Sequence, residues 1–266
     1  MAPNPYPEAT VFHSEARSLV SSVVGQEFRI PVWLPPSYAQ SERTYPVLYV
    51  TDSNLMFGMA TDAVALLLFG QEIPEIIVVG IAYPMQSYDD WARIRRRDLT
   101  PTAMPDRPGS GGADRFLTFL RTELFPFIET NYWVDPADRA LFGYSLGGLF
   151  TLYTLFSQPS LFRRYIAGSP SVKWDASTLL QVEAAYAVEH RTLPATLFMS
   201  SGSLEVNPKA IDTLSAVQNF DAILRGRHYD GFHHEYLVFD GETHLSGVAP
   251  ALVRGAKSIY ASAPAS

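Results

Sequence analysis

The stretch RALFGYSLGGLFTLYTLF, residues 139–156, is an apolar run interrupted by Gly-Tyr-Ser-Leu-Gly-Gly. Glycine inside a regular element costs conformational entropy, so three glycines so close together need a structural reason. The apolar run before them is typical of a short buried strand, and the run after them is typical of a helix. We therefore predict a sharp turn between a strand and a helix, with one small hydroxyl side chain, that of Ser145, at its tip.

Outside this turn, the sequence alternates between strand-like and helix-like segments. Short apolar runs that favour strands fall at residues 11–20, 25–35, 45–52, 75–83, 140–145, 163–171, 194–202 and 234–241. Helical segments are predicted at residues 54–70, 113–132, 176–190, 209–225 and 245–261, and from residue 146. This order predicts an α/β fold: a mostly parallel central sheet with an antiparallel N-terminal hairpin and helices on both faces. One domain would span residues 1–266, with a lid or pocket loop rich in Arg, Pro and Gly at about residues 93–113.

Composition and charge exclude several functions. The 266 residues are 47% hydrophobic, and the net charge of −7 argues against nucleic acid as a partner. The chain has no cysteine, which excludes disulfides, thiolate metal sites and a cysteine nucleophile. No segment has the ~20 consecutive apolar residues of a membrane span, and the N-terminus lacks the pattern of a signal peptide. We therefore expect a cytoplasmic protein with no membrane partner. The sequence indicates no oligomeric state.

Residues 143–147, Gly-Tyr-Ser-Leu-Gly, fit the pattern G-x-S-x-G. Between a strand and a helix, this pattern is typical of a strained turn that exposes a nucleophilic serine, here Ser145. Side chains two positions away would collide with the turn, which explains Gly143 and Gly147. Leu146 would open the helix, so its N–H would lack an intrahelical acceptor and could donate to an oxyanion. The alternative is a glycine-rich turn that only lets the strand and the helix pack closely.

A serine nucleophile needs a base, and His244 is the predicted one. With this type of turn the order along the chain is serine, acid, histidine, so the base lies downstream. His244 follows the last predicted strand, in FDGETHLSG, and the carboxyl ends of parallel strands line the crevice of an open α/β sheet. Four other downstream histidines are predicted at helix ends or at the opposite edge of the sheet: His190, His228, His233 and His234.

Glu205 is the predicted acid. It is the first carboxylate after the strand at residues 194–202, in the loop SSGSLEVN. Asp212, in the following helix, and Asp240, in the last strand, are the alternatives. Both are less well placed to reach the histidine, and a solvent-exposed loop glutamate is the alternative interpretation of Glu205.

A second oxyanion donor is expected from the loop after the strand at residues 45–52. In VTDSNLMF the backbone N–H of Ser53 or Asn54 is the natural choice. The three histidines near residues 228–234, in HYDGFHH, lack a helix-spaced pair with a carboxylate partner. We therefore predict neither a metal nor a cofactor, and a small-molecule ester as the partner.

A series of motifs then runs along nearly the whole chain. In order they are VWLPPSY, YPVLYVTD, RRRDLTPT, GGADRFLTFLRTELFPFIE, GYSLGG, SPSVKWD and GETH. This combination resembles the putative-esterase family of α/β-hydrolases, which includes esterase D, trilactone siderophore esterases and feruloyl esterases. The R-D-x-T-P and S-P-S-x-x-W segments are most similar to the siderophore-esterase-like branch. The resemblance implies the α/β-hydrolase fold.

Carried over by position, the resemblance implies the same nucleophile, acid and base: Ser145, Glu205 and His244. It adds two substrate-binding residues, Arg97 near the pocket and Trp174 as an apolar wall. For these two, a solvated basic face and plain core packing are the alternatives. The chain departs from the family at Ser53, where relatives usually have glycine in L-D-G.

Together these residues predict a serine carboxylic-ester hydrolase that works through an acyl-enzyme. The substrate is expected to be a small or aromatic ester or a lactone. An acyltransferase or a thioesterase with the same three residues is an alternative, the thioesterase being disfavoured by the missing cysteines. A non-catalytic binding protein on the same fold is a third possibility, since fold alone does not define function.

Overall fold

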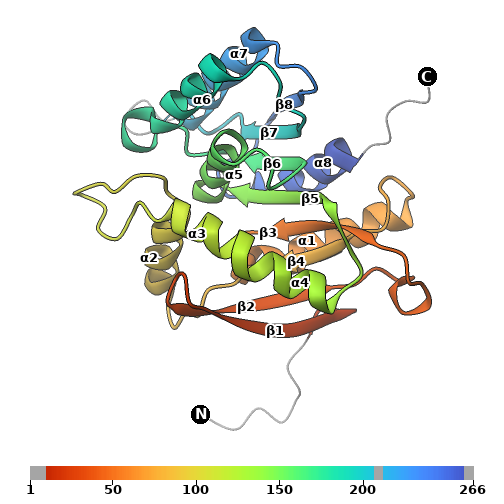
Figure 1. The fold of residues 1–266 in the computed structure, drawn as a ribbon. Helices are drawn as coiled ribbons and strands as arrows, with labels where there is room; N and C mark the ends of the chain where they lie inside the picture. The colour runs from red at the N-terminus through yellow and green to blue at the C-terminus, as the bar shows by residue number, and fades with distance from the viewer. Residues whose placement is uncertain (1–9, 207–211, 261–266) are drawn as a thin grey trace.

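The computed structural model describes residues 10–206 and 212–260, which contain one eight-stranded sheet (Figure 1). The strand order across the sheet is β1-β2-β4-β3-β5-β6-β7-β8. The strands are β1 Ser14–Ser21, β2 Gln26–Trp33, β3 Tyr45–Val50, β4 Ile77–Gly80, β5 Val134–Tyr144, β6 Arg164–Gly168, β7 Thr196–Gly202 and β8 His233–Phe239.

Strands β1 and β2 form the N-terminal hairpin, and β2 also pairs antiparallel with β4. All the other neighbouring strands pair in parallel. A parallel sheet covered on both faces has no polar side, as the fully buried IVVG of β4 illustrates. This confirms the predicted mostly parallel sheet with an antiparallel hairpin.

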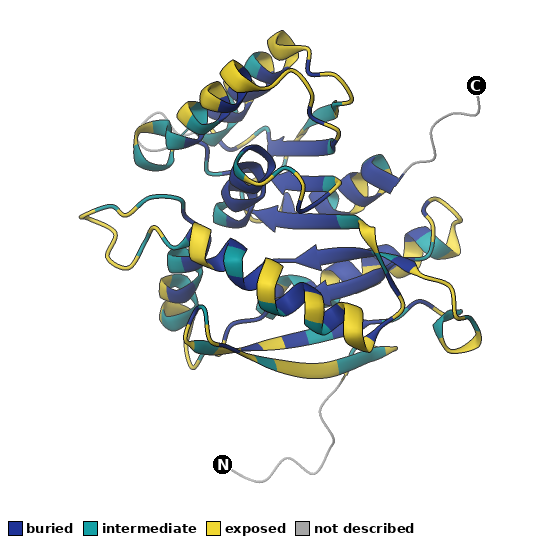
Figure 2. Cartoon of the chain, viewed as in Figure 1, coloured by how far each residue is buried: buried dark blue, intermediate teal, exposed yellow. Residues whose placement is uncertain are grey.

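Helices cover both faces of the sheet, and the central strands β3, β4, β6 and β7 are almost wholly buried, whereas the outer strands β1 and β8 are partly exposed (Figure 2). The neighbours Leu141 and Phe142 on β5 belong to two different hydrophobic clusters, because successive strand residues point to opposite faces. The cluster around Phe142 includes α1 and α8, and the cluster around Leu141 includes the remaining helices. The helices are α1 Ser53–Phe69, α2 Tyr88–Asp98, α3 Ala113–Phe119, α4 Phe125–Asn131, α5 Leu146–Ser157, α6 Thr178–Glu189, α7 Thr213–Arg227 and α8 Val248–Tyr260. Within the described residues, none of these helices has both the length and the apolar character needed to cross a membrane.

The expected irregular loop at residues 93–113 begins as a helix. Helix α2 continues to Asp98, and only the residues after it are irregular. Ser87 caps the helix by accepting a hydrogen bond from the N–H of Asp90 (3.1 Å). Acidic residues lie in the first turn and arginines in the last, which suits the helix dipole. The run of arginines is therefore a helical surface, which corrects the expectation of a loop.

The helix expected at residues 113–132 is divided by a π-type turn, Leu120–Leu124, between α3 and α4. Pro126 lies in the first turn of α4. Proline donates no backbone hydrogen bond and its ring clashes with the carbonyl four residues earlier, so the regular ladder is interrupted there. The amphipathic face continues across the break, since Phe116, Leu120 and Leu124 are all fully buried.

The carboxyl ends of the parallel strands meet at one edge of the sheet. Residues 51–54 follow β3, Ser145 follows β5, Glu205 follows β7 and His244 follows β8. Since β5, β6, β7 and β8 are consecutive neighbours in the sheet, the segments that follow them lie side by side. This edge holds the candidate site.

Candidate active site

Ser145 lies at the tip of a sharp turn between β5 and α5, with φ 59° and ψ −114°. Positive φ is uncommon for residues other than glycine and persists only where the surroundings enforce it. The Ser145 N–H donates to the Gly168 carbonyl (2.9 Å), and the Ser145 carbonyl accepts from the Ser171 N–H (3.1 Å). A Cβ on Gly143 would lie 2.1 Å from the Gly147 carbonyl oxygen, so only glycine fits beneath the serine.

Glu205 and His244 form a hydrogen-bonded pair at the same edge. Nδ1 of His244 lies 2.7 Å from Oε2 of Glu205. The other oxygen, Oε1, accepts from the Gly202 N–H (2.7 Å) and from the Ser169 hydroxyl (2.6 Å). Burial alone would raise the pKa of the Glu205 carboxyl, but the hydrogen bonds from His244, Ser169 and Gly202 outweigh it and hold that pKa below its ordinary value. Glu205 is therefore an ionised acceptor, and His244 carries its proton on Nδ1.

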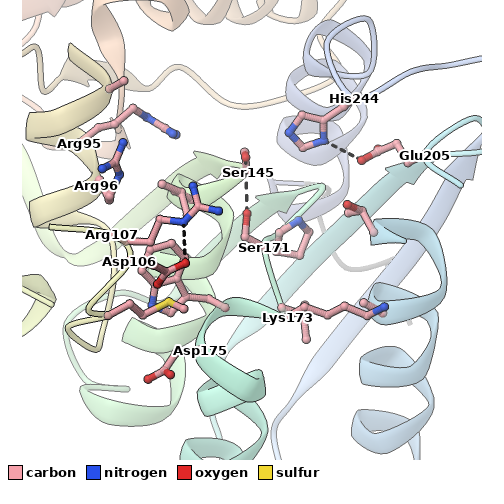
Figure 3. Close-up of a pocket in the computed structure, with 18 of the residues that line it drawn as sticks. Arg95, Arg96, Asp106, Arg107, Ser145, Ser171, Lys173, Asp175, Glu205 and His244 are labelled. Atoms are coloured by element: carbon pink, nitrogen blue, oxygen red, sulfur yellow. Dashed lines mark hydrogen bonds and ion pairs between the residues drawn. The ribbon is translucent and has the colours of Figure 1, made fainter. Parts of the chain in front are cut away.

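All three residues line one cavity of about 660 Å³ (Figure 3). The glutamate side chain is almost fully buried, at 2% exposure, whereas the imidazole is 40% exposed and faces the cavity. Ser145 Oγ lies 3.5 Å from Ser171 Oγ, and no hydrogen bond joins Ser145 to His244 in the part of the chain that the structure describes. Such contacts are often long before a substrate is bound and tighten with it. The structure thus brings the serine, the acid and the histidine together in one cavity.

The oxyanion side of the site differs in part from expectation. Leu146 lines the cavity, and its N–H belongs to the first turn of α5, where no helical acceptor exists. The Ser53 N–H donates to the Ile81 carbonyl (3.2 Å), so it is already engaged, which corrects the expectation for Ser53. The Asn54 side chain bonds both backbone groups of Tyr83 (2.8 and 2.9 Å) and fixes the first turn of α1. The backbone N–H of Asn54 stays the candidate second donor.

The structure does not bring Arg97 into the cavity. Its guanidinium pairs with the buried Asp98 (2.7 Å) and reaches Gln26 Oε1 (2.9 Å). Arg95 and Arg96 line the cavity instead. The reason is that residues 88–98 are helical, so each successive side chain turns by about 100° and Arg97 points away from the site. This corrects the expectation for Arg97.

Arg95 joins α2 to the start of α1. It forms two hydrogen bonds with the buried Asp52, at 2.8 and 2.7 Å, and a third, longer one with the Tyr144 carbonyl (3.4 Å). Its guanidinium also lies over the Trp91 ring, 4.7 Å from the centroid. Asp52 immediately precedes α1 and has a left-handed backbone. The pair therefore fixes the cavity wall against the oxyanion side.

Trp174 lines the cavity, as expected, and its Nε1 donates to Thr102 Oγ1 (3.2 Å). The loop after α2 supplies Met104, Asp106 and Arg107, and Leu204 and Val206 flank Glu205. Lining residues that were not predicted from the sequence include four with polar side chains, Ser171, Arg95, Arg96 and Arg107. The signal for the two α2 arginines was present in the helix cap and in the charge distribution of residues 87–98. Ser171 lies within the SPSVKWD motif, but nothing in the sequence indicates that it contacts Ser145.

The other histidines have structural positions. His190 and His228 are the residues that end α6 and α7, and His234 bonds Asp221 at 3.0 Å. His233 is exposed at the start of β8, at the opposite edge of the sheet. Asp212 caps α7 through the Ser215 N–H. Among the described residues, no group of three or more histidine or acidic side chains could hold a metal ion.

The fold and this turn define the class of protein. A mostly parallel sheet with G-x-S-x-G between a strand and a helix, and a histidine and an acid after later strands, is the arrangement of an α/β-hydrolase. The sequence pattern described as "Putative esterase" matches residues 21–253. The chain belongs to the putative esterase family. It is a carboxylic-ester hydrolase of the serine type.

Relatives of known name agree with this assignment. The chain is 33% identical over 262 residues to ferri-bacillibactin esterase BesA of Bacillus subtilis (strain 168). This match covers 92% of this chain and 88% of the relative. The crystal structure of the BES protein from Bacillus cereus is similar with a TM-score of 0.85 and 28% identity, covering 96% of this chain and 97% of that one. Siderophore hydrolase EstB from Aspergillus nidulans also gives a TM-score of 0.85, with 26% identity and coverage of 98% and 99%.

The fit beneath Ser145 predicts that Gly143→Ala destabilises the protein by roughly 3 kcal/mol, because the added methyl group overlaps the Gly147 carbonyl. Thermal unfolding measures the loss, and esterase activity should fall with it. Gly58→Ala is the matched control. A Cβ on this α1 glycine meets nothing within 4 Å, so the variant should be about 0.5–1 kcal/mol more stable. Equal melting temperatures for the two variants would contradict the prediction.

The lowered pKa of Glu205 predicts an acid-sensitive contribution to stability. The unfolded carboxyl titrates at its ordinary, higher pKa, so the ionised form stabilises the fold above that value, and the contribution disappears as the pH falls through the folded pKa. Between about pH 5 and about pH 3, the melting temperature of Glu205→Gln should therefore fall less than that of the wild type. Asp240→Asn, at an exposed carboxylate nearby, should behave like the wild type. An unchanged acid sensitivity in Glu205→Gln would disprove the contribution.

Proposed function

We propose that this chain hydrolyses an ester bond of a siderophore through an acyl-enzyme formed on Ser145. The observation that carries the proposal is the Glu205–His244 pair, 2.7 Å apart, in the cavity that Ser145 also lines. The relatives named above supply the substrate class, since one is a ferri-bacillibactin esterase and another a siderophore hydrolase. A siderophore is therefore the proposed substrate, in place of the broader expectation from the sequence of a small or aromatic ester or a lactone.

In the first step, Ser145 Oγ attacks the ester carbonyl while Nε2 of His244 takes its proton. Glu205 accepts from Nδ1–H, so it fixes the tautomer in which Nε2 is free to act as the base, and it stabilises the imidazolium that forms. The N–H of Leu146 donates to the oxyanion, with the backbone N–H of Asn54 as the second donor. His244 then protonates the leaving alcohol.

In the second step, water attacks the acyl-enzyme and the same groups act in reverse order. The 40% exposure of the imidazole gives water access to the base, which favours hydrolysis over transfer to another alcohol. Ser171 Oγ, 3.5 Å from Ser145 Oγ, lies within reach of the reacting centre in both steps.

The lining of the cavity supports an anionic siderophore. Four cationic side chains line it: Arg95, Arg96, Arg107 and Lys173. Three acidic side chains also line it: Asp106, Asp175 and Glu205. Asp52 neutralises Arg95, and Glu205 is turned towards His244, so the charge that faces the cavity is positive on balance. Trp174 offers a flat apolar surface to an aromatic or acyl portion of the ligand.

Replacement of the nucleophile tests the reaction. Ser145→Ala should lower kcat for a trilactone siderophore and for p-nitrophenyl butyrate by about 10⁴-fold or more, because the hydroxyl forms the acyl bond. Product formation is followed by chromatography and absorbance, and circular dichroism checks the fold. A fluorophosphonate probe should label the wild type and leave the variant unlabelled. Substantial turnover by the folded variant would overturn the assignment of Ser145.

Arg96 tests the proposed substrate class. Arg96→Gln should raise KM for a ferric siderophore about 5-fold, since an attraction of about 1 kcal/mol to an anionic ligand is lost. KM for the uncharged p-nitrophenyl butyrate should stay unchanged. Arg93→Gln is the matched control, because Arg93 is on the same helix but is 64% exposed and does not line the cavity. If both variants behave alike on the ferric siderophore, the charge of the cavity does not select the substrate.

A further inference from the structure

We propose that Tyr144 and Ser169 are positioning residues that hold Glu205, and through it His244, in the working geometry. The inference rests on the proposed function, because it assigns a role to two buried hydroxyls behind the acid. Ser169 Oγ lies 2.6 Å from Glu205 Oε1 and 2.8 Å from the Tyr144 hydroxyl. The side chains of both residues are buried, so neither contacts the substrate.

The direction of each hydrogen bond in this chain follows from elimination. Glu205 is ionised, as its lowered pKa indicates, so its oxygens only accept. Ser169 has a single hydroxyl proton and must donate it to Glu205 Oε1. The bond between Ser169 and Tyr144 is then left for the tyrosine to donate. The resulting order is Tyr144 O–H to Ser169 O–H to Glu205, with Nδ1–H of His244 on the far oxygen.

The backbone fixes where both hydroxyls lie. Tyr144 is the residue immediately before the nucleophile, so its position is tied to the strained turn. A Cβ on Gly168 would lie 2.4 Å from Tyr144 Cδ2, so the tyrosine ring occupies space that only glycine leaves open. Ser169 follows β6 with a φ of 37°, and its N–H donates to the Ser200 carbonyl (2.8 Å). The ring of Tyr144 also packs against the imidazole of His244, with centroids 5.4 Å apart.

The surrounding titratable groups leave this order intact. Burial, opposed by the bond with Ser169, raises the pKa of the Tyr144 hydroxyl, so it remains a neutral donor throughout the working range. The charges of Glu205 and then of Glu242, from the segment after β8, raise the Tyr144 pKa further. Tyr236 on β8 has a pKa raised by burial and is bonded to Ser201, so it too stays neutral.

The consequence is a carboxylate with one oxygen reserved for the histidine. Ser169 and the Gly202 N–H occupy Oε1, which leaves Oε2 to accept from His244. Without the Ser169 donor, the carboxylate charge is less well satisfied, so the pKa of Glu205 rises and its attraction for a proton on the imidazole strengthens. A protonated Glu205 cannot hold the imidazole in place, and a protonated His244 cannot take the proton of Ser145. The free enzyme therefore stays inactive up to a higher pH.

Ser169→Ala tests this in the whole chain with p-nitrophenyl butyrate as the substrate. We expect kcat to fall about 10-fold with KM within about twofold, and the acid limb of the kcat/KM profile to move to higher pH. Tyr144→Phe should move the limb in the same direction by a smaller amount, because Ser169 keeps its bond to Glu205. Ser200→Ala is the matched control. Ser200 is equally buried on β7, and within the described residues its Oγ has no hydrogen-bond partner.

The outcomes separate this inference from the proposed function. An unmoved acid limb in folded Ser169→Ala overturns the positioning role, and so does an equal movement in Ser200→Ala. If Ser169→Ala does not fold, the acid limb of Tyr144→Phe decides in the same way. Loss of activity in Ser145→Ala together with an unmoved limb defeats only the inference. Activity surviving in Ser145→Ala defeats the proposed function itself.

Discussion

The backbone of Ser145 has a conformation that a serine adopts only under constraint, and the architecture of the site depends on it. A left-handed or otherwise sparsely populated conformation costs about 1–3 kcal/mol. Here Gly143 lets the following helix approach from below, and hydrogen bonds with Gly168 and Ser171 hold the backbone from the side. As a consequence of this turn, the Ser145 side chain lies at the edge of the sheet. Ser145 lines the same cavity as Leu146, the first residue of α5.

Four neighbouring strands then supply the rest of the site in their order across the sheet. Strand β5 leads to Tyr144 and Ser145, β6 to Ser169 and Ser171, and β7 to Glu205, while His244 follows β8. Parallel neighbours are about 4.8 Å apart, so groups at their carboxyl ends come within hydrogen-bond reach after short loops. This explains why the two serines that follow β6 lie between Ser145 on one side and Glu205 on the other. One faces the cavity, and the other is buried behind it.

A feature of this fold or site can be predicted from the sequence when its cause lies within one short segment of the chain. The alternation of strands and helices, the turn at Ser145, and the residues that follow β7 and β8 are encoded in short apolar patterns and in glycines, so they were predictable. The expectation that Arg97 lies near the pocket came from the family resemblance, and a resemblance by position does not fix where a side chain points on α2. The engagement of the Ser53 N–H by Ile81 depends on contact between β4 and the start of α1. No pattern within either segment encodes that contact.

The pairing of Arg95 with Asp52 connects the part of the cavity wall formed by α2 to the segment that precedes α1. Asp52 is 1% exposed and Arg95 11%, and their two hydrogen bonds have bidentate geometry. Removing charges from water offsets much of the attraction in such a pair, so its contribution is better described as fixing geometry than as adding stability. Because Arg95 also reaches the Tyr144 carbonyl, one guanidinium links α2, the start of α1 and the strand that leads to Ser145. A rigid connection of this kind sets the distance between Arg96, on the wall formed by α2, and the hydroxyl of Ser145.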